Sequence, residues 1–412
     1  MNRSERFSDT DLCVKCGLCL PHCPTYGKTL DENESPRGRI ALIQGWAQGS
    51  LAMTPELTKH IDNCLLCRSC EAVCPAYVPY GSLVDRFRSE SGQTGKTASA
   101  RLKSAAIKIA LTDKRASRWA ERLIGKSGGS RRGLLRRSGL FRALELSEFE
   151  AGLPENSTAE RRSEFYPAKD GNERRRVALF LGCTANLLDT ETVASALAVM
   201  NRLGVGVRVP EAQACCGALH SHAGDEASAR KLMARNLAAF DLSDADTVVT
   251  FASGCGAMLH DYPQLESAAS GFASKVQDIC QFLAELAWIG DIEPLPLAAK
   301  VCVHTPCTLK NVLRAERYGT DLLRRIPSLE VAPLPSSLRC CGAAGSYMLE
   351  HPEMAGALRD DVLEAVVAAR PDFLATSNPG CAAHLRAGLK KKGLGHIEVL
   401  HPVTLLARRL VR

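Results

Sequence analysis

Eight cysteines near the N-terminus are spaced to bind two iron-sulfur clusters. Cys13, Cys16, Cys19 and Cys23 follow the pattern C-x2-C-x2-C-x3-C-P, and the pattern returns at Cys64, Cys67, Cys70 and Cys74. In the two-cluster arrangement that uses this run, three close thiolates bind one 4Fe-4S cubane and the fourth crosses to the other. We therefore predict one cluster held by Cys13, Cys16, Cys19 and Cys74, and a second held by Cys64, Cys67, Cys70 and Cys23.

The alternative interpretation of these cysteines is a pair of structural zinc sites. Such sites take four ligands each, usually as two C-x2-C units. That pattern explains neither the third close cysteine of each run nor the prolines at Pro24 and Pro75. The spacing favours iron-sulfur clusters.

A second cysteine pattern occurs twice in the C-terminal two thirds of the chain. Each copy contains a lone Cys, a Cys-Cys-Gly and a further Cys: Cys183, Cys215, Cys216 and Cys255 in the first, and Cys307, Cys340, Cys341 and Cys381 in the second. Four thiolates at one end of a sheet can hold an iron-sulfur centre. The sequence leaves open whether each copy holds a four-thiolate cluster or a degenerate site. Cys280 and Cys302 lie outside the motifs, and we expect both to be small buried apolar residues.

The elements that must position these cysteines follow from a duplication. RVALFLGCT (176–184) matches KVCVHTPCT (300–308), and CCGALHS (215–221) matches CCGAAGS (340–346). Short apolar runs alternate with helical stretches in each copy, as in βαβ units around a parallel sheet. The cysteines follow the strands, at the carboxyl ends where open α/β sheets bind ligands.

Four regions result from this reading. We predict a two-cluster ferredoxin-type domain at 1–92, a basic helical linker at 93–172, and two duplicated α/β cysteine-rich domains at 173–292 and 293–412. The fold class is therefore mixed α+β and α/β, with a helical N-terminal lobe followed by the two α/β copies.

A helix is predicted at 35–46, between the two N-terminal cysteine runs. Ser35 is placed as the N-cap and Pro36 at the first helical position. Ile40, Ile43 and Trp46 would pack against the cluster lobe. For Arg37 and Arg39 two interpretations stay open: they hold an acidic partner or offset cluster charge, or they form a solvated first turn.

Charge is concentrated in the linker. Residues 96–140 contain 13 Lys and Arg against Asp113 and Glu121, a net charge of +11 in a chain whose total is +7. This segment either docks on anionic lipid or an acidic protein surface, or is a solvated spacer. It lacks the aromatic platform of a nucleic-acid site, so no nucleic-acid partner is expected. The chain shows neither an apolar signal core nor a membrane-spanning run, which predicts a reducing, cytoplasmic setting.

These motifs resemble the heterodisulfide reductase D-like family with its CCG domains, and within it the iron-sulfur subunits of glycolate oxidase. The resemblance is carried by PRGRI (36–40), ASGCGA (252–257), HTPCTL (304–309), CCGAAGSY (340–347) and NPGCAAHL (378–385). It departs from true heterodisulfide reductases at the fifth cysteine of each copy, where Met258 and His384 stand. Five-thiolate clusters are therefore not expected; His384 could be a ligand or a packed residue.

The resemblance implies an electron-transfer subunit that contributes no catalytic residue of its own. Because the chain has no G-x-G-x-x-G after a strand, the substrate-oxidising FAD is expected only in partner subunits. Those partners would oxidise glycolate to glyoxylate, and electrons would pass to a quinone or another acceptor at the cytoplasmic face of the inner membrane. The alternatives are the equivalent subunit of a lactate or glycerol 3-phosphate dehydrogenase, or a disulfide reductase of the heterodisulfide type.

Overall fold

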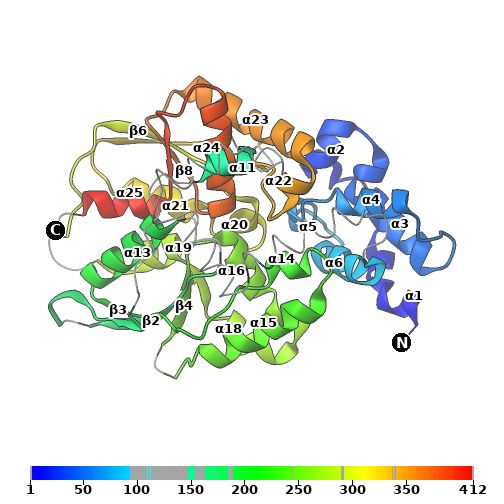
Figure 1. Ribbon diagram of the computed structural model, residues 1–412, viewed down its shortest axis with the longest axis horizontal. Coiled ribbons are helices and arrows are strands. Elements are labelled where there is room, and N and C mark those ends of the chain that lie inside the picture. The colour runs from blue at the N-terminus through cyan, green and yellow to red at the C-terminus, as the bar shows by residue number, and fades with distance from the viewer. Residues whose placement is uncertain are drawn as a thin grey trace.

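The computed structural model describes residues 2–92, 109, 112, 147–153, 163–171, 173–183, 189–243, 245–288, 292–335, 337 and 340–410. The N-terminal helical lobe, blue and cyan in Figure 1, lies at one end of the molecule, and the C-terminus lies at the opposite end. The basic segment 96–140 falls outside the described residues, apart from Ile109 and Thr112. No helix among the described residues has the length and apolarity required to cross a bilayer.

Short helices and turns build the N-terminal lobe around one apolar core. Its helices are α1 (Arg3–Arg6), α2 (Pro24–Thr29), α3 (Pro36–Ala47), α4 (Pro55–Asp62), α5 (Ser69–Ala72) and α6 (Tyr80–Ser91). The predicted helix at 35–46 is confirmed, because the Ser35 side chain accepts from the Gly38 amide and Pro36 is the first helical residue. Ile40, Ile43 and Trp46 are buried in the same core as several of the N-terminal cysteines.

Two parallel sheets with the same strand order form the rest of the molecule. The first has the order β1-β3-β2-β4-β5 and the second β7-β6-β8-β9. Apart from the short β1, which is antiparallel to β3, every pair in both sheets is parallel. If β1 is set aside, β2, β3, β4 and β5 correspond in order to β6, β7, β8 and β9. The predicted fold class, a helical lobe with two duplicated α/β domains, is confirmed.

The elements of the two copies follow one plan. The first copy contains β1 (Phe165–Tyr166), β2 (Arg175–Phe180), α13 (Thr190–Arg202), β3 (Val205–Arg208), α14 (Ala218–Ser221), α15 (Glu226–Ala239), β4 (Thr247–Thr250), α16 (Ser253–His260), α17 (Tyr262–Leu265), α18 (Ser270–Ala273), β5 (Val276–Asp278) and α19 (Ile279–Glu285). The second contains β6 (Ala299–Val303), α20 (Cys307–Asn311), α21 (Glu316–Leu323), β7 (Leu329–Pro333), α22 (Tyr347–Glu350), α23 (Pro352–Ala369), β8 (Phe373–Ala375), α24 (Pro379–Lys391), β9 (Glu398–Leu400) and α25 (Pro402–Arg409).

The copies pack against each other through two equivalent pairs of helices. Helix α13 of the first packs on α25 of the second, and α19 of the first packs on α21 of the second. One apolar core runs through both, from Val193 and Phe282 to Leu322 and Leu405. A short helix ahead of the first sheet, α11 (Ser147–Gly152), lies on α24, and its Glu148 pairs with Lys391 of α24 and Arg359 of α23.

A buried histidine in this shared core makes stability depend on pH. His401 is the N-cap of α25, and its Nδ1 accepts from the Val403 amide at 3.0 Å. Burial lowers the pKa of His401 to about 3, whereas an unfolded His titrates near ~6.5. The unfolded chain therefore binds a proton that the folded chain does not, and stability falls as the pH drops below about 6.5.

We expect His401→Asn to flatten this acid dependence. Asn keeps an N-cap acceptor but does not titrate. At pH 5 the wild type carries a penalty of about 2 kcal/mol from this histidine, at roughly 1.4 kcal/mol per pH unit. Thermal unfolding between pH 5 and 7.5 measures it, with the exposed His396→Asn as control. Equal slopes for His401→Asn and the wild type would contradict the assignment.

Candidate functional site

The two N-terminal cysteine runs have the same backbone conformation around their second cysteine, and it curves each run around a central space. Lys15 and Gly17, on either side of Cys16, have φ of 55° and 85°. Leu66 and Arg68, on either side of Cys67, have φ of 52° and 55°. Left-handed backbone costs an L residue roughly 1–2 kcal/mol, so three non-glycine residues here are held against their preference by the loops around them.

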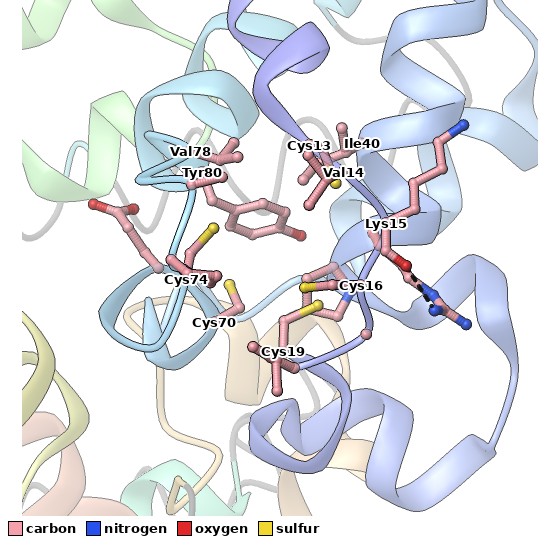
Figure 2. Close-up of a pocket in the computed structure, with 17 residues that line it drawn as sticks. Cys13, Val14, Lys15, Cys16, Cys19, Ile40, Cys70, Cys74, Val78 and Tyr80 are labelled. Atoms are coloured by element: carbon pink, nitrogen blue, oxygen red, sulfur yellow. Dashed lines mark hydrogen bonds between the residues drawn. The ribbon is translucent and has the colours of Figure 1, made fainter.

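The first run lines a pocket that also receives the last cysteine of the second run. Its lining cysteines are Cys13, Cys16, Cys19, Cys70 and Cys74. Figure 2 shows their sulfur atoms turned toward a common space beside the ring of Tyr80. The structure thus brings together the four cysteines predicted for the first cluster, and Cys70, predicted for the second, lines the same space beside them (Figure 2). Cys16 is exposed, so this pocket opens to solvent.

The second predicted set lies deeper in the lobe. Cys23, Cys64, Cys67 and Cys70 are all buried. Burial, followed by the neighbouring Cys67, Cys64 and Cys23, raises the pKa of the Cys70 thiol well above its usual value. Burial likewise raises the pKa of Cys67. Thiols in such surroundings become thiolates when a metal centre takes the proton's place.

The chemistry of these side chains fits iron-sulfur clusters. Among the described residues, no three His, Cys, Asp or Glu side chains converge closely enough to bind a single metal ion. A cubane instead takes each thiolate at a different iron, so its ligands surround a space, as the pocket cysteines do. The pocket walls between them are apolar, with Val14, Ile40 and Val78.

Each α/β copy gathers its four cysteines at the carboxyl end of its sheet. Cys183 follows β2, and Cys215 with Cys216 follows β3. The sulfurs of Cys215 and Cys183 lie 3.4 Å apart. Hydrogen bonding with Cys183 and Cys216 lowers the pKa of Cys215, and the Cys216 thiol interacts in turn with Cys255.

The second copy repeats this row of thiols. Cys307 begins α20 after β6, and its pKa is raised by a hydrogen bond with Cys340 and by burial. Cys341 interacts with both Cys340 and Cys381. Gly342 has φ of 84°, and a Cβ there would lie 2.5 Å from the Ala355 carbonyl oxygen. Glycine therefore lets this loop approach α23 and close the cysteine row.

His384 and Met258 stand at the positions of the fifth cysteines, and the structure shows what each side chain contacts. His384 is buried in α24, and its Nε2 lies 3.1 Å from the Ala355 carbonyl oxygen. This nitrogen is used by the backbone of α23, which favours the packed-residue interpretation over a ligand. Met258 is buried in the core of the first copy.

Other sequence expectations resolve as follows. Cys280 and Cys302 are 1% and 0% exposed within the apolar cores, as predicted for small buried residues.

Arg37 pairs with Glu32 on the surface of the lobe. For Arg39 the solvated first turn is wrong. Its side chain is fully buried and bonded to Glu34, because residue 39 lies on the same face of α3 as Ile43 and Trp46.

Contacts from the lobe reach both α/β copies through the second cysteine run. Asn311, at the end of α20, donates to the Cys67 carbonyl oxygen at 2.7 Å. Arg68 pairs with Asp261, at the end of α16, at 2.6 Å. Sequence analysis did not single out Asn311 or Arg68. Both are residue types that usually lie on the surface, and no local pattern marks either one as a contact between domains.

The two copies differ in how closely their cysteines approach the lobe. Cys67 and Cys340 belong to one apolar cluster, with Leu65 and Tyr347, and Cys307 packs against it. The first-copy cysteines lie in a separate cluster within their own domain. The second copy is thus the one whose cysteine row abuts the ferredoxin-type lobe.

Comparison with known proteins agrees with this division of the chain. A 4Fe-4S dicluster domain profile matches residues 9–78, and a cysteine-rich domain profile matches residues 177–260 and 301–386. The chain is 34% identical to the probable glycolate oxidase iron-sulfur subunit of Bacillus subtilis, over 98% of this chain and 95% of that protein. It is 30% identical to the glycolate oxidase iron-sulfur subunit of Escherichia coli, over 97% and 96%. Lactate utilization protein A of Geobacillus kaustophilus matches at 30% over 57% of this chain and 99% of its own length.

Proposed function

The chain belongs to the family of glycolate oxidase iron-sulfur subunits, and from this premise we propose that it carries electrons from flavin-containing partner subunits that oxidise glycolate. The observation that supports an electron-carrying role most directly is the continuity of its cysteine sets. They run from the exposed Cys16, through the buried set around Cys67, to Cys307 and Cys340 of the second copy.

The proposed electron balance is simple. Oxidation of glycolate to glyoxylate releases two electrons and two protons, which the flavin of a partner subunit takes up. The clusters that this chain would hold would supply one-electron transfer. Reduction of a quinone to the quinol would then need two such transfers and two protons.

The residues of this chain would hold and insulate the carriers. Cys13, Cys16, Cys19 and Cys74 would bind one cluster, and Cys64, Cys67, Cys70 and Cys23 the other. The two rows of four cysteines in the α/β copies would bind further iron-sulfur centres. Tyr80, which is 3% exposed, lines the first pocket and places its hydroxyl 3.6 Å from the Cys64 sulfur, so it lies between the two sets.

Purification of the native complex under anaerobic conditions tests this proposal. We expect at least about eight irons per chain for two clusters, a co-purifying flavoprotein, and bleaching of the iron-sulfur absorbance when glycolate is added. Bleaching by lactate or glycerol 3-phosphate but not by glycolate would reassign the donor. A sample dominated by zinc, or one without a flavin partner, would refute electron transfer from a flavin subunit.

A further inference from the structure

A fully buried arginine lies beside the deeper cysteine set. Arg39 is 0% exposed, and the titratable groups around it include Tyr80, Cys64 and Cys23 as well as Glu34. Its Nε donates to the His60 carbonyl oxygen at 2.7 Å, and one terminal nitrogen donates to Glu34 Oε2 at 2.5 Å. Burying a guanidinium is costly unless it is fully bonded, and here every arm has a partner.

The third arm of Arg39 leads to a cysteine sulfur. Its other terminal nitrogen donates to Thr25 Oγ1 at 3.1 Å, and Thr25 Oγ1 lies 3.3 Å from the Cys23 sulfur. Thr25 Oγ1 itself donates to the Glu34 carbonyl oxygen at 2.9 Å. The Cys23 sulfur is therefore linked to the Arg39 guanidinium through the hydroxyl oxygen of Thr25.

The carboxylate partner of Arg39 is turned the other way. Glu34 Oε1 lies 2.7 Å from His60 Nδ1 and accepts from Asn63 Nδ2 at 2.8 Å. Asn63 in turn accepts through its carbonyl oxygen from the Tyr347 hydroxyl of the second copy at 3.1 Å. The positive end of the ion pair is therefore linked through Thr25 to the Cys23 sulfur, and its negative end faces polar donors.

We propose that Arg39 is a positioning residue that raises the reduction potential of the cluster held by Cys23 and Cys64. Reduction adds a negative charge, which burial in a low-dielectric lobe opposes. A fixed cation that reaches the Cys23 sulfur through a single intervening group, Thr25 Oγ1, offsets that cost. The inference rests on the proposed function, and it adds that the deeper cluster is kept reducible by the more exposed one at Cys16.

Redox titration followed by EPR measures the effect in the anaerobic complex. We expect Arg39→Gln to lower the midpoint potential of one cluster by about 59 mV, which is a tenfold change in the equilibrium constant of a one-electron reduction. Arg39→Lys keeps the charge and should retain most of the wild-type potential. Because Arg39→Gln removes the cation that pairs with the buried Glu34 carboxylate, the double variant Arg39→Gln/Glu34→Gln provides a form in which both charges of the pair are absent.

Arg37→Gln is the matched control, since Arg37 lies two residues away and lines the pocket of the other set. It should leave the potential of the cluster at Cys23 and Cys64 unchanged. Equal potentials in Arg39→Gln, the double variant and the wild type, or a shift as large in Arg39→Lys, would overturn the inference. Iron content is measured first in every sample. A wild-type protein without clusters would refute the proposed function itself, whereas normal clusters with unaltered potentials refute only the role of Arg39.

Discussion

Replacing Cys23 or Cys74 with serine is expected to abolish electron transfer to external acceptors, while glycolate still reduces the flavin of the partner subunits. Each is the last cysteine of its run and the predicted crossing ligand. Cys74 lines the pocket of the first run, and Cys23 lies buried among the deeper set. Each replacement should remove about four irons per chain, and the two variants should lose different EPR signals.

Cys280→Ala is the matched control for these variants. Cys280 is buried like Cys23, but it lies in the core shared by the two α/β copies and outside the cysteine motifs. It should keep full iron content. Loss of flavin reduction by glycolate in a complex that is still assembled would mean that this chain takes part in substrate chemistry, contrary to the proposed division of labour.

Replacing Cys341 with alanine should slow reoxidation by the acceptor by at least about tenfold, while both ferredoxin-type clusters remain present and reducible. Cys341 interacts with Cys340 and Cys381 in the copy whose cysteine row abuts Cys67. Removal of its sulfur should empty that row of its iron-sulfur centre. Stopped-flow reoxidation of the glycolate-reduced complex measures the rate.

A neighbouring cysteine separates this effect from simple loss of packing. Cys302 lies in the same apolar core as Cys341 and Cys381 but is not part of the row. Cys302→Ala removes the same volume and should leave reoxidation unchanged. If the two variants behave alike, the rate reports core packing and the second copy carries no electrons.

Sequence patterns were sufficient for features that depend on local spacing or on repetition. The cysteine runs, the Ser35 cap of α3 and the strand-helix alternation of the two copies are all encoded within a few neighbouring residues. The fold class followed from these, and both sheets adopt the expected parallel arrangement. Assignment of individual cysteines to clusters and the boundaries of the four regions stay predictions.

Long-range polar contacts were beyond such patterns. Asn311 meets Cys67 across 244 residues and Arg68 meets Asp261 across 193, so no local period reveals either pair. The burial of Arg39 does have a local signal in the sequence. Residue 39 is four residues before Ile43 and seven before Trp46, which places it on the apolar face of the helix. Because fully buried arginines are rare, this spacing alone does not distinguish a buried Arg39 from a solvated one.

The way the two α/β copies pair resembles the interface of a symmetric homodimer. Helix α13 corresponds to α21 of the second copy, and α19 corresponds to α25. The two contacts between the copies, α13 with α25 and α19 with α21, are therefore the same contact made twice, as across a two-fold axis. Two identical subunits would have to present the same surface twice, and each would attract its own lobe. On one polypeptide the halves have diverged: Asn311 stands where the first half has Leu187, and Asp261 stands where the second has Ala387. Fusion thereby fixes the stoichiometry at one ferredoxin-type lobe per pair of cysteine-rich halves. It also makes the two halves inequivalent, because each contacts the lobe through a different residue.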